Sequence, residues 1–205
     1  MKIEWYGIII GVQPRIRLTR SFDQRQDSYL GYILSVDGKI GDDFSQFTLG
    51  IGKGAQSKYK FQTGDKVRGL CESVANPHME PSEYYKASKL TVISRGQPGP
   101  PPPWTDQADD LEVYRSRGHR RLNTTTYSKH CLSCKWGCRM AVEIIVDHWN
   151  PNQRKFRTET FCYGPKSCGF YKAGPTRKVP GRKGMTWEEE DWIDEQETEH
   201  RGLND

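Results

Sequence analysis

The chain has 205 residues, of which 34% are hydrophobic, and its formal net charge is +5. The mean hydropathy of −0.84 is polar, but six Trp, ten Tyr and seven Phe can build small cores, which argues against a fully disordered chain. No apolar run approaches the ~20 residues that span a bilayer, and no basic, cleavable leader opens the chain. We therefore expect a cytoplasmic protein without a membrane partner.

Residues 1–95 predict a series of short β-strands. The expected strands cover residues 5–20, 29–36, 47–51, 66–72 and 86–94, with turn signals at Asp37-Gly38 and Gly64-Asp65. In the first strand Arg15 and Arg17 alternate with Ile16 and Leu18. This alternation places the two arginines on the solvent face of a half-buried strand.

Five strands in this stretch, a long first strand and the phrase F-x-x-G-D-x-V-x-G at residues 61–69 resemble an OB-fold. An SH3-like barrel is the structural alternative. The resemblance implies binding of single-stranded DNA or RNA on strands two and three and the loops beside them. The cations and aromatic residues expected to contact the strand lie on strand one and the loop after it, on strand two, and in the loop after strand three. They are Arg15, Arg17, Arg20, Tyr29, Tyr32, Lys53, Lys58 and Tyr59.

Residues 96–104 contain four consecutive prolines, which favour an extended, semi-rigid spacer. We interpret the segment as a linker between two modules. Recruitment of a proline-binding protein domain is the other interpretation.

Five of the six cysteines lie between residues 131 and 168, spaced C-x2-C-x3-C and then C-x5-C. A predicted β-hairpin of residues 140–149 and 154–161 joins the two groups and brings them to one end, as in a zinc ribbon. The preferred Zn²⁺ ligands are Cys131, Cys134, Cys162 and Cys168, with Cys138 as the alternate ligand. An iron–sulfur cluster on Cys131, Cys134, Cys138 and one later cysteine is the rival interpretation.

The cysteines lie in the most basic part of the chain. Residues 111–183 contain sixteen Lys and Arg against four Asp and Glu, which points to a polyanionic partner such as nucleic acid. No Ser/His/Asp order and no H-E-x-x-H motif is visible, so we do not expect an enzyme. The residues expected to contact nucleic acid in this part are Lys135, Trp136, Arg139, Arg154, Lys155 and Arg157.

Residues 184–205 reverse the charge, with nine acidic residues and one arginine. Thr186-Trp187-Glu188-Glu189 fits a capping box and predicts a helix over residues 187–199. One hypothesis is that this tail lies across the basic surface and competes with nucleic acid. The alternative is a solvated tail that aids solubility.

The sequence as a whole predicts a mainly β protein. We expect an OB-like barrel (1–95), a Pro-rich linker (96–104), a basic zinc-ribbon-like module (105–183) and an acidic helical tail (184–205). The expected function is non-enzymatic binding of single-stranded nucleic acid. The alternatives are an adaptor that binds proteins through the Pro-rich linker or the acidic tail around a structural zinc, and an iron–sulfur redox or sensor protein. The phrase F-C-Y-G-P-K-S-C at residues 161–168 is similar to one in uncharacterised bacterial proteins, which assigns no function.

Overall fold

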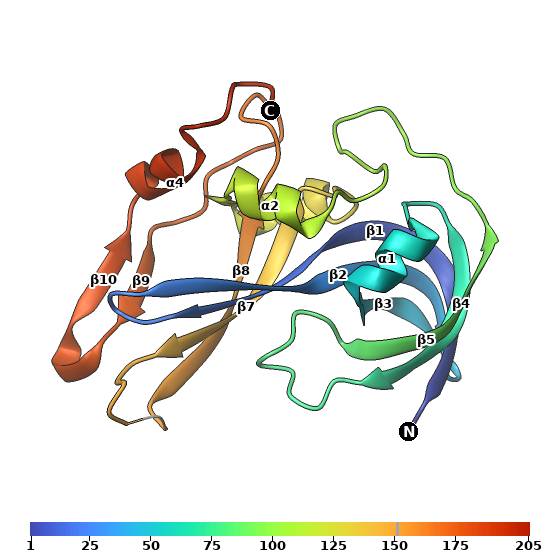
Figure 1. Ribbon diagram of the computed structural model, residues 1–205, viewed down its shortest axis with the longest axis horizontal. Helices are drawn as coiled ribbons and strands as arrows, with labels where there is room; N and C mark the ends of the chain where they lie inside the picture. The colour runs from blue at the N-terminus through green and yellow to red at the C-terminus, as the bar shows by residue number, and fades with distance from the viewer. Residues whose placement is uncertain (151) are drawn as a thin grey trace.

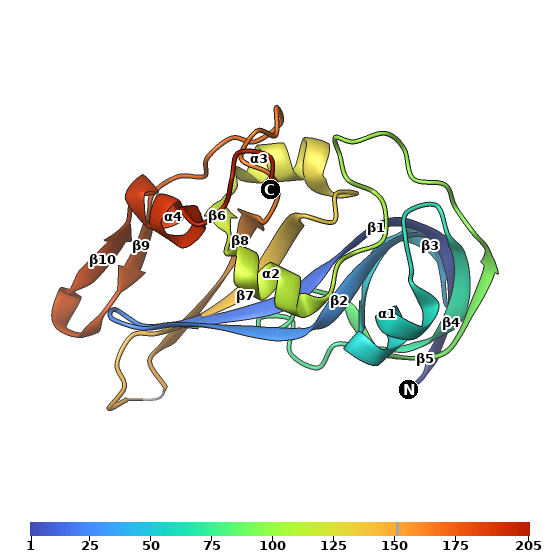
Figure 2. The same ribbon diagram turned by 45° about the horizontal axis from the view of Figure 1, so that its top comes forward.

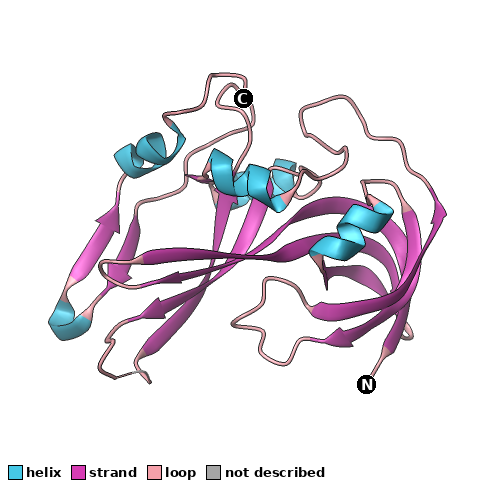
Figure 3. Ribbon diagram, in the orientation of Figure 1, coloured by secondary structure: helices cyan, strands magenta, loops and turns pink. Residues whose placement is uncertain are grey.

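The computed structural model describes residues 1–150 and 152–205 and is mainly β (Figures 1 and 3). The strands are β1 (Ile3–Arg20), β2 (Arg25–Ile40), β3 (Asp43–Ile51), β4 (Lys66–Ser73), β5 (Tyr84–Ser94), β6 (Arg120–Arg121), β7 (Gly137–Ile145), β8 (Arg154–Cys162), β9 (Arg177–Pro180) and β10 (Thr186–Glu189). The helices are α1 (Lys53–Tyr59), α2 (Leu111–Arg117), α3 (Thr124–Thr126) and α4 (Asp191–Thr198), with a π-helical turn η1 (Tyr127–Cys131) and a 3₁₀ turn η2 (Arg182–Gly184).

The first five strands close into a ring, which Figure 2 shows at the right of the molecule. β1 pairs with β2 on one side and with β4 on the other, and the order continues β2–β3–β5–β4. The ring requires close approach of β1 and β2 where Gly7 faces Gly38. A Cβ on Gly38 would lie 2.2 Å from the carbonyl oxygen of Tyr6, so only glycine fits there.

β1 is long enough to serve two parts of the sheet. Its first half pairs with β4, while Arg17–Arg20 at its end pair in parallel with Ala141–Ile144 of β7. The hairpin β7–β8 and the short β6 extend the same sheet, and the buried apolar side chains of both halves form one core cluster. The sheet therefore continues across the predicted boundaries at residues 95 and 105.

The Pro-rich segment is attached to the ring at both ends. The Gln62 side chain donates to the carbonyl oxygen of Gly96 (2.7 Å), and the backbone N–H of Thr63 donates to the carbonyl oxygen of Thr105 (3.4 Å). Next to it, the carbonyl oxygen of Trp104 accepts from the backbone N–H of Lys135 (2.8 Å). These contacts join the segment to the turn before β4 and to the cysteine-containing loop.

Three local predictions differ from the structure: a turn, a loop and a helix start. The Asp37-Gly38 turn was wrong because Gly38 pairs with Gly7 inside β2, and the chain turns instead at Gly41, where φ is +57°. The expected loop of residues 53–59 is the helix α1. The capping box at Thr186 was also wrong: residues Thr186–Glu189 pair with β9 as a strand, and α4 begins only at Asp191. Pairing with an available strand edge outweighed the local capping signal.

Candidate nucleic-acid interface and thiol cluster

The two arginines expected on the solvent face of β1 are held by a loop. Arg15 Nη2 lies 2.7 Å from Glu80 Oε2, and Arg17 Nη2 lies 3.1 Å from Glu80 Oε1. Their side chains are 13% and 28% exposed, and Glu80 comes from the loop between β4 and β5. Glu80 thus pairs with both arginines that the sequence had assigned to nucleic acid and offsets one of their two positive charges.

Three further residues predicted to contact nucleic acid, Tyr32, Tyr29 and Arg20, are buried or half-buried in the protein. Tyr32 is 1% exposed and its hydroxyl donates to the carbonyl oxygen of Asp109 (2.8 Å). Tyr29 is half-buried, with the Arg115 guanidinium 4.9 Å from its ring centre. Arg20 is 3% exposed and forms ion pairs with acidic side chains of β8 and β10. These side chains hold the sheet together.

Lys53 and Lys58 are exposed on α1, at a different edge of the ring. Lys58 Nζ lies 4.9 Å from the ring centre of Tyr59, which stacks on Phe61 with ring centres 5.3 Å apart. The helix therefore presents two cations, but the aromatic residue beside them is partly covered.

In the second half of the chain, Lys135 and Trp136 were expected to be exposed, and this was wrong. Each is 8% exposed, and Lys135 Nζ lies 2.8 Å from Asp106 and 3.0 Å from Asp109. The residues on β7 and β8 differ: Arg139 and Lys155 are exposed, whereas Arg154 pairs with Glu143 and Arg157 pairs with Glu159.

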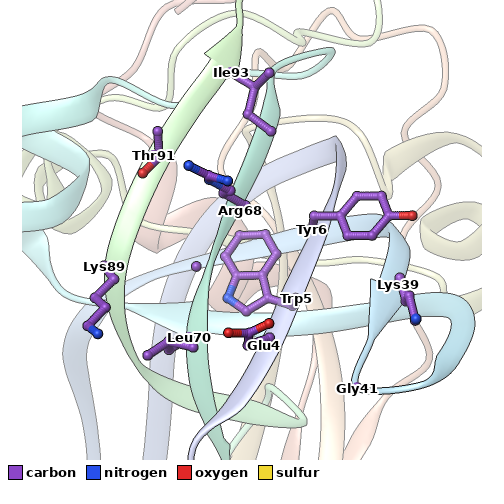
Figure 4. Close-up of a pocket in the computed structure, with 11 residues that line it drawn as sticks. Glu4, Trp5, Tyr6, Lys39, Gly41, Arg68, Leu70, Lys89, Thr91 and Ile93 are labelled. Atoms are coloured by element: carbon purple, nitrogen blue, oxygen red, sulfur yellow. The ribbon is translucent and has the colours of Figure 1, made fainter.

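A groove of about 620 Å³ opens instead on the outer face of the ring, across β1, β4 and β5 (Figure 4). Its lining combines apolar and cationic side chains, with Glu4 as a carboxylate at one end. Exposed apolar side chains in and beside it are Tyr6 (43% exposed), Ile8 (47%), Phe44 (72%) and Ile93 (52%). Its cations are Lys39, Arg68 and Lys89.

Strand pairing fixes the centre of this groove. Tyr6 on β1 lies opposite Lys39 on β2 and opposite Arg68 on β4, so an aromatic ring has a cation on each neighbouring strand. The Phe44 ring packs edge-on against Tyr6 with centres 6.3 Å apart, and Lys39 Nζ lies 6.0 Å from the Phe44 ring centre. The arrangement offers flat apolar surface between positive charges.

The β5 side of the groove has an irregular backbone. Lys89 has a φ of +50°, and the register between β4 and β5 shifts between Arg68 and Leu70. Bulges of this kind re-aim side chains, and a non-glycine residue in the left-handed region is a costly conformation found often at binding sites. Lys89 is exposed at this point.

Sequence reasoning missed this groove, although β1 carried a signal for it. Trp5 and Ile9 are 2% and 0% exposed and point inward, so Tyr6 and Ile8 have the outward parity. The apolar residues Ile8, Ile9 and Ile10 obscure that alternation in the sequence. On β4, Val67 is buried and Arg68 is exposed, so the same alternation marks Arg68 as facing outward.

Four cysteines line one small enclosed space of about 20 Å³. Cys131 and Cys134 come from η1 and the turn after it, while Cys162 ends β8 and Cys168 follows in the next loop. Cys162 Sγ accepts a hydrogen bond from the backbone N–H of Gly164 (3.3 Å).

Cys138 lies apart from this group. It is fully buried on β7, and its Sγ donates to the carbonyl oxygen of Pro14 on β1 (3.5 Å). Its environment is that of a core side chain packed against the first strand.

The four thiols fit a closed metal site in their chemistry. Two cysteines from each of two loops are the donor set of structural zinc. Burial, followed by the neighbouring thiols, raises the pKa of Cys131 to about 12, and burial raises that of Cys134 to about 11, so a cation is needed to favour the thiolates. In residues 1–150 and 152–205, no group of three or more His, Cys, Asp or Glu side chains has the mutual geometry of a metal centre.

The acidic tail contacts basic residues of the sheet. Glu189 pairs with the buried Arg20, and Glu197 Oε1 lies 3.0 Å from Arg25 Nη1. On β6, Arg121 Nε lies 3.0 Å from Asp194 Oδ2. The acidic part of the tail thus lies against β1, β2 and β6, at the opposite end of the molecule from β4 and β5 (Figure 1).

No family model matches the sequence, and comparisons with curated proteins and with solved structures gave no match. Within the described part of the chain, no helix has the length and apolar character needed to cross a membrane. The groove and the thiol cluster are therefore the basis for assigning a function.

Proposed function

We propose that the protein binds single-stranded nucleic acid in the groove on the outer face of β1, β4 and β5. The observation that carries this proposal is Tyr6, 43% exposed and flanked on adjacent strands by Lys39 and Arg68. We interpret residues 1–95 as an OB-type barrel, a fold that commonly binds oligonucleotides. The five-stranded ring closed by β1 and β4 supports that interpretation.

The chemistry of the groove suits unpaired bases. A base can stack on Tyr6 or Phe44 with any identity, because every base has a flat face, and each stacked base is worth ~1–3 kcal/mol. Lys39, Arg68 and Lys89 then contact phosphates and release counterions, which adds affinity that falls with salt. These groups bind and position a strand, so we propose a binding role and not a catalytic one.

We further propose that Cys131, Cys134, Cys162 and Cys168 hold a structural Zn²⁺. The four thiols line the same enclosed space, and the ion would favour their thiolate forms and cross-link the two loops. Metal analysis of the purified protein tests this directly. One zinc per chain is expected, whereas iron with visible absorption would assign the iron–sulfur alternative.

The nucleic-acid proposal is tested by fluorescence anisotropy with labelled single-stranded DNA, single-stranded RNA and duplex DNA. We expect Tyr6→Ala and Phe44→Ala each to weaken single-strand binding by roughly 5- to 100-fold, in line with the loss of one stacked base. Trp192→Ala is the matched control, since Trp192 is an aromatic side chain of similar exposure (51%) on α4.

Tyr6→Phe should keep most of the affinity, because the stacking surface remains. No binding of any of the three nucleic acids by folded wild-type protein would overturn the proposal. Equal affinities of the wild type, Tyr6→Ala and Phe44→Ala would assign the binding to another surface.

One observation favours a protein partner as a second candidate function. A cavity of about 520 Å³ lies between the β1–β2 turn and the tail, lined by Trp187 (39% exposed), Trp192 and Phe22. Its charged lining residues are Asp23, Glu189 and Glu197 against Arg20 and Arg25, and this slight acidic excess around two tryptophans suits a basic peptide with an apolar anchor. Tryptophan fluorescence titration with a lysine-rich amphipathic peptide would test it, and an unchanged signal would exclude this class of ligand.

A further inference from the structure

Three arginines from distant parts of the chain converge on the backbone that follows Cys162. Arg117 Nε donates to the carbonyl oxygen of Tyr163 (2.8 Å), and Arg120 Nη2 donates to that of Pro165 (3.1 Å). Arg201 Nη1 donates to the carbonyl oxygens of Tyr163 (2.9 Å) and Gly164 (3.1 Å). One short loop thus carries three guanidinium groups from α2, β6 and the tail.

None of these three guanidinium groups has a carboxylate oxygen within 4.0 Å among the described residues. Arg117 stacks over Trp136 (4.4 Å) and Arg120 over Tyr171 (3.8 Å), which gives partial compensation. Buried donors still lack partners on all three side chains, and Arg201 as a residue is only 7% exposed. Buried charges of one sign without a counter-ion are costly, so a nearby anion is expected.

The four-cysteine group lies directly beside this cluster, because Trp136 and Tyr171, on which Arg117 and Arg120 stack, line the same space as the four cysteines. The loop that the arginines hold begins directly after Cys162, and the backbone N–H of Gly164 in that loop points at Cys162 Sγ (3.3 Å). Gly164 also lines the space that the four cysteines share. Four thiolates around one divalent ion leave a net charge of −2, which three guanidinium groups offset.

We propose that Arg117, Arg120 and Arg201 are the counter-ions of the four-cysteine metal centre and determine how tightly it retains its ion. This inference rests on the metal site of the proposed function. The arginines act as positioning residues, because they hold the loop and its charge and do not ligate the ion. Outer groups of this kind typically change metal affinity by 10- to 100-fold.

The C-terminal residues are attached to the same loop as the three arginines. Arg201 lies close to the C-terminus, and the neighbouring backbone is tied to the loop before Cys168: the N–H of Ser167 donates to the carbonyl oxygen of Leu203 (2.9 Å), and Lys166 Nζ to that of Arg201 (3.3 Å). The last residues are therefore tied to the loop between Cys162 and Cys168, while the acidic part of the tail lies on β1, β2 and β6.

The experiment measures release of zinc from the full, metal-loaded chain to a chromophoric chelator. We expect Arg201→Gln and Arg117→Gln each to release zinc roughly 10- to 100-fold faster than wild type, in line with the usual effect of outer groups. Arg201→Lys keeps the charge and should restore much of the retention. Arg182→Gln, at an exposed arginine of η2, is the control and should match wild type.

A second readout separates a charge effect from simple unfolding. In the cobalt-substituted protein, the thiolate-to-metal absorption of Arg117→Gln should shift relative to wild type, while far-UV circular dichroism stays unchanged. Equal release rates and equal cobalt spectra in all variants would overturn the proposal. It would also be overturned if Arg201→Lys, which keeps the charge, released zinc as fast as Arg201→Gln. A wild-type chain without stoichiometric metal would instead overturn the metal site itself.

Discussion

The side-chain amide of Gln13 donates to the carbonyl oxygen of Cys131, 118 residues further along the chain, at 2.7 Å. The same amide nitrogen lies 2.9 Å from the carbonyl oxygen of Cys134, and the Gln13 amide oxygen accepts from the Tyr127 hydroxyl at 2.7 Å. Gln13 is 3% exposed in the middle of β1. A single buried amide therefore attaches the ring to the loop that carries the first two cysteines.

Gln13→Ala should lower the free energy of unfolding by about 2–3 kcal/mol, because it leaves a buried hydroxyl and two buried carbonyl groups without this partner. Urea unfolding followed by tryptophan fluorescence measures the change. Gln46→Ala, at an exposed position of β3, is the control and should stay within about 0.5 kcal/mol of wild type. An unchanged midpoint for Gln13→Ala would show that the loop is held by other contacts.

The cysteines should separate into two classes on substitution. Cys134→Ser and Cys162→Ser are expected to lose bound metal, whereas Cys138→Ala should retain it, since the Cys138 thiol contacts Pro14 of β1 and not the thiol cluster. Metal content per chain after gel filtration measures both outcomes. Loss of the ion in Cys138→Ala with retention in Cys134→Ser would assign the alternate ligand instead.

The groove cations should set the salt dependence of nucleic-acid binding. Each of Lys39→Gln, Arg68→Gln and Lys89→Gln is expected to reduce the slope of log affinity against log salt by about 0.7 if it removes one phosphate contact to a single strand. Anisotropy titrations at several salt concentrations measure the slope. Lys178→Gln, at an exposed lysine of β9, should leave it unchanged, and a drop in this control equal to those in the groove would argue for non-specific attraction.

Glu189 should make the protein sensitive to acid. Burial raises its pKa, but Arg20, Arg25 and Arg177 lower it by more, so the net shift is below the ordinary value of 4.5. The carboxylate therefore contributes stability at pH values above 4.5, and this contribution is lost as the pH falls through the lower pKa of the folded state. Glu159 also lies beside Arg20 and Arg177, with Arg177 Nη1 at 2.8 Å and Arg20 Nη1 at 3.5 Å.

Glu189→Gln should accordingly cost roughly 1–3 kcal/mol at pH 7, because the buried Arg20 loses this partner and keeps only Glu159. The difference from wild type should shrink as the pH falls below 4.5, as measured by urea unfolding between pH 7 and pH 3. Glu188→Gln removes an exposed pair with Lys178 and should cost at most about 1 kcal/mol. A pH-independent difference for Glu189→Gln would contradict the conclusion that folding lowers the pKa of Glu189.

The tail should not compete for the groove. β10 and α4 lie at the end of the molecule opposite β4 and β5 (Figure 1), and exposed charges separated by more than ~8 Å are largely screened at physiological salt. Glu195→Gln with Glu199→Gln, both exposed on or next to α4, should change single-strand affinity by less than about twofold. A tenfold gain would support competition by the tail.

The local patterns in the sequence predicted most strands of the ring and the β7–β8 hairpin. Alternation such as Arg15-Ile16-Arg17-Leu18 depends only on which side of a strand faces the core, and Ile16 and Leu18 are indeed 0% exposed. The helix α1 and the strand β10 were not predicted correctly. For β10, the edge of β9 competed with the capping signal of Thr186 and Glu189.

The sequence alone therefore determined the mainly β character, the grouping of cysteines and the reversal of charge near the C-terminus. Only the tertiary structure decided which charges remain available. Arg15 and Arg17 meet Glu80, Arg20 meets Glu189 169 residues away, and Tyr6 is left exposed between two cations. The physical reason is that side-chain periodicity is a local property, whereas the neutralisation or exposure of a charged or aromatic group depends on which distant strand or loop packs against it.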